Sequence, residues 1–396
     1  MTTPGRQDRR ELPIGRRVAQ LRARRGMSQQ VLADRVGRSK SWVDKVERGV
    51  RTLDRLSVIE TVAAALGVAP GVLVGRAARR TPVTDAATAV ERIRAVLAHH
   101  DPTGDQPPSA AELDRQIGYA WAAYRHAHHP QMLRMLPDLL AATRDLDRPD
   151  AGLPVRVYQL TAQVLVKLGE PHLAWLAADR AMTAAAGHPR RTALAAVPLA
   201  QALRALDRGR LAMAVATTAV RAIDSVPARA TVPDDPALAA TLFTEAALAA
   251  ATCGDTSAMD DLTERAANCA ARHADDGGGF GPIVVDLARA LAAARLGDNH
   301  LAIALHQRAV CGDAWQRLPA EHRAAHLIDI TRAHLDLGDH CAAGRALVTA
   351  DRIAPAEVRL RPAAHAALAA VLRAGPTPAD LTRLATTVGL TRPRVG

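Results

Sequence analysis

The apolar residues of this chain recur every three or four positions, the spacing that one face of an α-helix requires. Ile14, Val18 and Leu21 form the first such stripe, and Gly26 ends it. Hydrophobic residues make up 48% of the chain but aromatic residues only 2%, so the cores must be built from Ala, Leu and Val. Because these residues favour close helix packing over a β-sandwich, the sequence predicts an all-α protein. At 396 residues it is too long for one ordinary domain.

Residues 1–75 carry the stripes and cap residues of five short helices. The expected helices are one from Pro13 to about Arg25, one from Gln29 to Val36 capped by Ser28, one from about Lys40 to Arg48 capped by Ser39, one from Thr52 or Asp54 to Gly67, and a short last turn from Pro70. Gly37 and Gly49 supply the tight turns after the second and third helices.

The cap, turn and core residues of this segment follow one another at characteristic spacings: Ser28-Gln29, Leu32-Ala33, Gly37, Val43, Val46, Glu47 and Gly49. Over about residues 12–75 the chain closely resembles the helix-turn-helix domain of the XRE family, relatives of the phage lambda repressor. The resemblance implies a five-helix, lambda-repressor-like DNA-binding domain whose helix 39–48 lies in the major groove. It also implies an internal ion pair between Arg22 and Glu47. Trp42 stands where the family has a small polar residue, and we expect it to be a partly buried packing residue.

One face of the expected recognition helix is polar. Val43 and Val46 face the core, which leaves the polar residues between them on the outer face. Lysine can donate to guanine, serine to either type of base, and aspartate can accept from cytosine. Gln29 matches the family glutamine that grips a phosphate, and Arg38, Arg48 and Arg51 are placed for further phosphate contacts. The predicted DNA-binding residues are Gln29, Arg38, Ser39, Lys40, Ser41, Asp44, Lys45, Arg48 and Arg51.

The net positive charge of the chain is confined to the same region. The net charge is +11, and residues 1–80 alone hold sixteen Arg and two Lys against seven acidic residues. A small basic unit joined to a long neutral one predicts that the first part meets a polyanion, here double-stranded DNA, and that the second part does something else.

Residues 76–110 read as a linker that contains one helix. Arg76, Arg79, Arg80 and Pro82 form a basic stretch, a helix begins at Thr84 or Asp85, and His100 to Pro108 is a break rich in Pro and Gly. The helix carries a stripe of Val90, Ile93, Val96 and Leu97. This stripe must be buried, either on the following domain or against its copy in a second subunit.

Residues 111–396 repeat with a period of about forty. Gly169, Gly209, Gly254, Gly297 and Gly338 each separate two apolar helical segments. Small residues recur five and twelve positions after them, although Arg221 breaks this rule, and the pattern is similar to the tetratricopeptide repeat. His128-His129-Pro130 begins a degenerate first copy, with Ala141 twelve positions after His129. The resemblance implies an α-solenoid of six helix pairs, a right-handed superhelix with a concave groove, capped by helices at about Ala356–Leu372 and Pro378–Val388.

In such repeats the first helix of each pair lines the groove. The polar residues expected there are Gln116, Tyr119 and His126 from the first pair, Arg156, Gln159 and Gln163 from the second, and Arg332. They predict a site for a peptide or small-molecule effector. Solvated helix faces would produce the same pattern.

Signals for catalysis or metal binding are poor. His322 and His326 lie four apart, but Arg323 stands where a zinc protease has its Glu, so we interpret them as structural. His126, His128 and His129 are interpreted as solvated turn residues, and Gly277, Gly278, Gly279 and Gly281 as a flexible connection between repeats. The four cysteines, Cys253, Cys269, Cys311 and Cys341, lie far apart, which fits reduced thiols. The sequence therefore predicts no enzyme, no cofactor and no metal.

Together these features predict a transcriptional regulator with three parts: a DNA-binding domain at 1–75, the linker at 76–110 and the repeat domain at 111–396. Bacterial regulators of this domain order include peptide-responsive quorum-sensing receptors, which makes a peptide effector an analogy. We expect a cytoplasmic, nucleoid-associated homodimer without a membrane segment. The alternatives are a DNA-tethered adaptor whose groove binds a partner protein, and an enzyme with an appended DNA-binding head.

Overall fold

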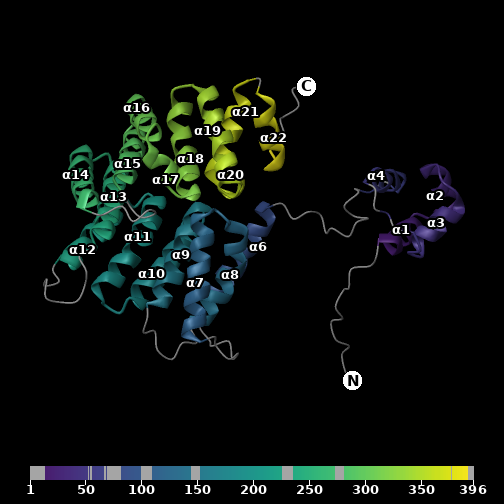
Figure 1. The fold of residues 1–396 in the computed structure, drawn as a ribbon, viewed down its shortest axis with the longest axis horizontal. Coiled ribbons are helices and arrows are strands. Elements are labelled where there is room, and N and C mark those ends of the chain that lie inside the picture. The colour runs from purple at the N-terminus through teal and green to yellow at the C-terminus, as the bar shows by residue number, and fades with distance from the viewer. Residues whose placement is uncertain are drawn as a thin grey trace. The chain divides into compact units, whose positions relative to one another are not determined.

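The protein is described here from a computed structural model, which consists of two compact units, residues 1–81 and 82–396. The structure describes residues 14–51, 53, 56–66, 68, 82–99, 109–143, 152–224, 235–272, 281–375 and 377–390. All regular secondary structure in these ranges is helical, which confirms the predicted all-α class (Figure 1).

The first unit has four helices in its described part, α1 (Ile14–Arg24), α2 (Gln29–Val36), α3 (Lys40–Glu47) and α4 (Leu56–Ala65). The hydroxyls of Ser28 and Ser39 accept from the amides of Val31 and Trp42, as N-caps do. Gly37 ends α2 at φ 65°, a left-handed conformation that glycine adopts without strain. The last turn expected at Pro70, and both proposed starts of α4, lie outside the described residues.

The second unit begins with α6 (Pro82–Ala98), which is followed in the described residues by six pairs of helices. The pairs are α7 (Ala110–Arg125) with α8 (His129–Ala142), α9 (Leu153–Lys167) with α10 (Pro171–Ala184), α11 (Pro189–Ala205) with α12 (Gly209–Asp224), α13 (Pro236–Thr252) with α14 (Thr256–Arg272), α15 (Pro282–Arg295) with α16 (Asn299–Val310), and α18 (Ala320–Asp336) with α19 (His340–Ile353). The remaining helices are α17 (Asp313–Arg317), α20 (Pro355–Leu360), α21 (Pro362–Arg373) and α22 (Ala379–Thr387). The predicted helix pairs are thus present.

The turn positions of two pairs differ from the prediction by two residues. Gly209 is not a turn glycine: it is the first residue of α12, and the left-handed turn residue is Asp207, at φ 56°. Counting from Asp207, the positions five and twelve residues later are Ala212 and Ala219, both buried. The same shift applies to the first pair, where Ala127, at φ 56°, is the turn residue. The apparent exception at Arg221 was therefore an error of register.

The expected single helix from Ala356 to Leu372 is two helices. Arg361 has an extended backbone, with φ −82° and ψ 123°, between α20 and α21. The next residue is Pro362, and a residue before proline is disfavoured in the α conformation. Before the break, α20 contacts α6 and α8, and after it α21 packs against α18 and α19.

The repeat array closes on itself, which the prediction of a right-handed superhelix with a concave groove did not include. The first helices of successive pairs pack in order, α7 on α9, α9 on α11, α11 on α13, α13 on α15 and α15 on α18, and α18 then contacts α7. Leu360 of α20 lies in the core of the first pairs, whereas Ala127 of the first pair lies in the core of the last. We call this junction the seam. In Figure 1, α20 lies beside α6 and α8, which it contacts.

Helix α6 is docked on its own chain. Val90, Ile93 and Leu97 are buried, and α6 packs against α8, α10 and α20. Of the two partners predicted for this apolar stripe, the structure therefore selects the repeat domain. The stripe is not free to form a contact between subunits.

Candidate functional site

The solvent face of α3 carries the residues that the sequence assigns to DNA. Val43, Val46 and Glu47 are buried, as predicted for the two valines. The side chains of Lys40, Ser41, Lys45 and Arg48 are exposed. A short helix with a fully buried inner face is held rigidly, so its outer side chains are presented as one surface. The side chains on this surface can donate hydrogen bonds to base edges and to phosphate oxygens.

Several predicted DNA-binding residues also have partners within the domain. Asp44 forms an ion pair with Arg48 one turn later, with Oδ2 and Nη2 2.6 Å apart. Both side chains are substantially exposed, and such a pair contributes at most about 1 kcal/mol, so either group can exchange it for a base or phosphate. The hydroxyl of Ser39 accepts from the amide of Trp42 at 3.2 Å and thereby fixes the start of the helix.

Gln29 belongs to a polar cluster at the junction of α1, α2 and α3. Arg22 Nε donates to Glu47 Oε1 at 2.6 Å, which is the internal ion pair that the resemblance implies. The amide of Gln29 donates to Glu47 Oε2 at 2.9 Å. Burial would lower the pKa of Arg22, but the hydrogen bond from Arg22 to Glu47 outweighs it and raises that pKa. The cluster fixes α3 against the other two helices.

The remaining two arginines lie at the ends of the helix. Arg38 and Arg51 are both exposed, and Arg38 lies over the ring of Trp42, with its guanidinium carbon 5.9 Å from the ring centroid. Trp42 is half-buried and packs against the core of the domain, as the sequence predicts. The backbone amide of Arg51 donates to the carbonyl of Lys45, which holds this arginine near the end of α3.

The residues predicted to bind an effector do not all lie together. Arg156, Gln159 and Gln163 are half-buried on one face of α9, and Arg156 forms an ion pair with Asp114 of α7. Tyr119 of α7 is exposed and accepts a hydrogen bond from Gln131 of α8.

The others lie apart from the α9 face. Gln116 donates to Glu112 within α7, at 2.8 Å. His126 caps the end of α7 and is exposed. Arg332 is exposed on α18 and pairs with Asp336, at 3.7 Å. The structure thus brings together only the α9 residues as one polar face.

A cavity of about 420 Å³ lies elsewhere in the second unit, between α19, α21 and α22. Its lining includes Arg345, Val348, Val371 and Leu381. None of the predicted effector residues borders it.

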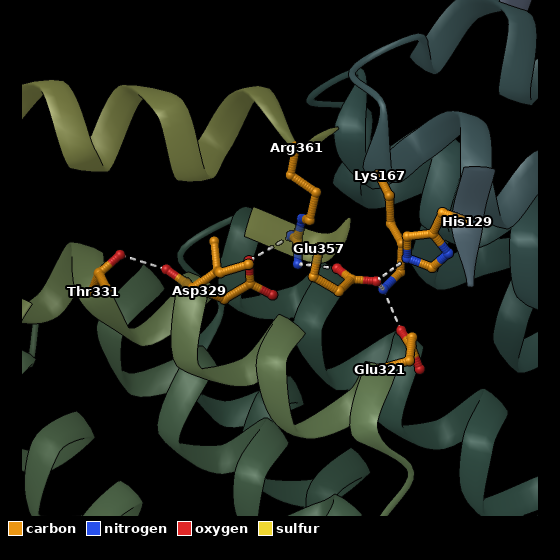
Figure 2. Close-up of polar contacts among 8 residues, drawn as sticks. His129, Lys167, Glu321, Asp329, Thr331, Glu357 and Arg361 are labelled. Carbon is orange, nitrogen blue, oxygen red and sulfur yellow. Dashed lines mark hydrogen bonds and ion pairs between the residues drawn. The ribbon is translucent and has the colours of Figure 1, made fainter. Parts of the chain in front are cut away.

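A buried ionic network occupies the seam (Figure 2). Glu357 of α20 has no exposed surface and accepts from His129 Nε2 at 2.5 Å and from Lys167 Nζ at 2.8 Å. Lys167 of α9 also donates to Glu321 of α18. Arg361 Nη1 reaches Glu357 at 3.4 Å, and its Nη2 donates to Asp329 at 2.7 Å, as the dashed lines in Figure 2 show. The seam network therefore joins α8 and α9 to α18 and α20.

The charged state of this network is strongly favoured. Burial would raise the pKa of Glu357, but Lys167, the His129 hydrogen bond and Arg361 together lower it well below its usual range. Burial would lower the pKa of Lys167, yet Glu321 and Glu357 raise it. Burial, and next Glu321, raises the pKa of Tyr124, whose ring lies 5.3 Å from the Lys167 ammonium. Both shifts favour the ionised forms of Lys167 and Glu357.

The sequence interpretation missed this network, and for His129 it was wrong. His129 is only 2% exposed rather than solvated, because the turn before it is Ala127 and the ring faces α20. A signal was present in Lys167: the chain has only three lysines, and this one lies at the end of an otherwise buried helix.

The other histidines agree with a structural role. His326 accepts or donates one hydrogen bond with His306, between Nε2 and Nδ1 at 3.0 Å, in a buried position beside Trp315. Burial lowers the pKa of His306 to about 4 and that of His326 well below its ordinary value. Among the described residues, no three His, Cys, Asp or Glu side chains are grouped as a metal site requires. The four cysteines are free.

The geometry of the first unit defines a class, the helix-turn-helix domains, and the comparison of sequences agrees. Residues 13–77 match a family described as "Helix-turn-helix domain", less than a fifth of the chain. No curated protein matches the sequence. Among solved structures, the chain is similar to the crystal structure of Bacillus thuringiensis PlcR in complex with the peptide PapR7 and DNA, at 14% identity and a TM-score of 0.34, covering 65% of this chain and 93% of that one. A TM-score at this level transfers no property of that protein to this chain.

None of the helices in the described ranges combines the length and apolar character that crossing a membrane requires.

Proposed function

We propose that the protein is a sequence-specific DNA-binding transcriptional regulator of the XRE type, as found in bacteria. The observation that carries the proposal is the helix α3, whose apolar side is buried while Lys40, Ser41 and Lys45 are exposed on its other side. The confinement of the +11 charge to residues 1–80 supports it, because a basic unit is attracted to the phosphate backbone.

In this proposal the predicted DNA-binding residues have three roles. Lys40, Ser41, Asp44 and Lys45 read base edges, and Arg48 serves both base and phosphate. Gln29, Arg38 and Arg51 hold phosphates, and Ser39 positions the helix by capping it. The role of Gln29 requires its amide to keep one donor for the phosphate while the other stays on Glu47.

The test is selection of bound fragments from random double-stranded DNA by the full-length protein. Enrichment of one motif supports the proposal. Recovery of unenriched DNA, with an affinity that falls with salt for every fragment alike, would leave a nonspecific DNA-binding protein and contradict it.

We further propose that the second unit receives a peptide or small-molecule effector at the polar face of α9, formed by Arg156, Gln159 and Gln163. Gln116, Tyr119, His126 and Arg332 stay predicted effector residues outside this face. The working form is a cytoplasmic homodimer at the nucleoid, because one recognition helix reads only about four or five base pairs. A co-purifying ligand identified by native mass spectrometry supports the effector. A partner protein bound at the same face would favour the adaptor instead.

A further inference from the structure

The seam differs in chemistry from the other joints of the array. Neighbouring pairs meet mainly through apolar surfaces: α13, for example, is buried along most of its length through Leu238, Leu242, Phe243 and a series of alanines, with Glu245 as its one buried charged residue. Leu360 of α20 also enters the core of the first pairs and Ala127 that of the last, but the seam network lies at the same junction. The joint that closes the array is therefore the most polar one described.

A polar joint opens more easily than an apolar one. Buried ion pairs gain little over their hydrated, separated state, because each charge regains water when the pair opens. The seam network also leaves His129 Nδ1 and Arg361 Nε buried without a hydrogen-bond partner among the described residues. Hydration on opening would satisfy both atoms. When an apolar joint opens, by contrast, the whole favourable free energy of burying its apolar surface is lost.

Helix α6 lies across this joint. It packs against α8 and α10 on one side of the seam and against α20 on the other. Arg92 and Arg94 add ion pairs to Asp138 and Glu170, which belong to the first pairs only. Opening of the seam would therefore separate α6 from α20 while its contacts to α8 remain. The first unit ends at residue 81, and α6 begins at the next residue.

We infer that the seam is a conformational latch: the repeat array opens reversibly between α20 and α8–α9, and α6 carries the change to the DNA-binding domain. Glu357 is the positioning residue of the latch, since it alone accepts from both sides, from His129 and Lys167 of the first pairs and from Arg361 after α20. An effector that favours one state would shift the population of the two. The transmission step rests on the proposed function, whereas the latch does not.

The test is amide hydrogen exchange of the full-length protein without DNA. Glu357→Gln keeps the shape of the side chain and removes the charge that Lys167 and Arg361 require. We expect exchange in α6, α7, α8, α18 and α20 to accelerate about tenfold or more, with α12 to α14 unchanged, because opening is local. Asp329→Asn, at the partly exposed edge of the network, should give a smaller change in the same helices if Glu357→Gln does not fold.

Glu245→Gln is the matched control. Glu245 is also buried and accepts from Arg204 at 3.1 Å and Gln201 at 2.6 Å, but these contacts join neighbouring helices α11 and α13 away from the seam. This variant should accelerate exchange around α11 to α13 and leave α6 and α20 protected. Uniform acceleration in both variants, or none at the seam in Glu357→Gln and Asp329→Asn, would overturn the latch.

The transmission step is measured separately, as affinity for DNA selected by the wild-type protein at fixed salt. Seam variants should change the Kd about fivefold or more, the lower range of allosteric coupling, while Glu245→Gln should not. Local opening with an unchanged Kd would disprove transmission and leave the latch. Failure of the wild type to select any sequence would disprove the proposed function, and the exchange result would still decide the latch.

Discussion

Gly15 and Val46 are in direct contact through the backbone. A Cβ atom added to Gly15 of α1 would lie 2.0 Å from the carbonyl oxygen of Val46 and 3.1 Å from its carbonyl carbon. Both neighbours are backbone atoms near the end of α3, so they cannot rotate away as a side chain could. The closeness of these two helices thus depends on a missing methyl group.

Gly15→Ala should destabilise the helix-turn-helix unit by about 3 kcal/mol, since the two helices must move apart and unpack their core. The measurement is thermal unfolding of the full-length protein followed by the indole N–H NMR signal of Trp42. Gly118→Ala in α7 is the matched control, because a Cβ there meets nothing within 4 Å. That change should be neutral or stabilising, by up to about 1 kcal/mol. Equal melting of the two variants would refute the close contact.

Substitutions of the predicted base-reading and phosphate-binding residues should affect DNA binding in two different ways. Lys40→Ala and Lys45→Ala should weaken binding to the selected motif much more than to random DNA, because each base contact is worth about 1–3 kcal/mol of discrimination. Arg51→Ala should weaken both by similar factors and reduce the slope of log K against log salt by about one. Titrations at several salt concentrations measure both quantities. Equal losses on motif and random DNA for both lysine variants would assign base reading to other residues.

The buried histidines predict loss of stability in mild acid. The folded pKa of His306 is lowered to about 4, against an ordinary value of 6.5, so below pH 6.5 the unfolded chain takes up a proton that the folded protein does not. The contribution of His306 to the free energy of unfolding is therefore fully present above pH 6.5. It is lost as the pH decreases towards 4, a loss on the order of 3 kcal/mol. His326 shifts in the same direction.

Denaturant unfolding at pH values between 4.5 and 7 measures this dependence. His306→Gln should flatten the curve, whereas His300→Gln, which changes an exposed histidine two turns earlier in α16, should not. A wild-type protein equally stable at pH 5 and pH 7 would show that these rings are charged in the folded state.

The effector site makes a prediction that separates sensing from folding. Arg156→Ala and Gln159→Ala should leave DNA affinity without effector intact and abolish the response to it, because they alter only the sensing state. Asp114→Asn breaks the same ion pair to Arg156 but keeps the guanidinium, so it should retain the response. A reporter gene under the selected motif provides the readout. A normal response from both alanine variants would remove these residues from the site.

The homodimer can be tested by light scattering and footprinting. We expect a mass of twice 41.9 kDa and a footprint with two related half-sites about 34–36 Å apart or a multiple of that distance. The contact must come from a surface other than the apolar stripe of α6, whose Ile93 and Leu97 are fully buried in the same chain. A monomer at micromolar concentration that fully occupies one asymmetric half-site would contradict the dimer.

The sequence predicted those features that depend on neighbours along the chain. The caps at Ser28 and Ser39 and the buried faces of α2 and α3 follow from local spacing, and the ranges of these two helices agree within one residue. The repeats were also visible, because a turn residue and small residues recur at fixed offsets. Asp207 and Ala127 were missed as turn residues since left-handed Asp and Ala are uncommon and a glycine or histidine stood nearby.

The seam was beyond this kind of reasoning. His129 and Glu357 lie 228 positions apart, and neither is unusual on its own. Their meeting depends on the accumulated rotation of six helix pairs, and small errors at each pair would separate them. Periodicity identifies which face of a helix is buried but not which distant helix covers it.

The closed array restricts how this protein can evolve. Open repeat proteins can gain or lose a unit by duplication or deletion, because each unit contacts only its neighbours. Here Leu360 completes the core of the first pairs and Ala127 that of the last. One extra pair inserted near α13 would carry Glu357 away from Lys167 and leave both cores exposed. The number of helix pairs is therefore itself a constraint, and new specificities must arise by substitution within a fixed count.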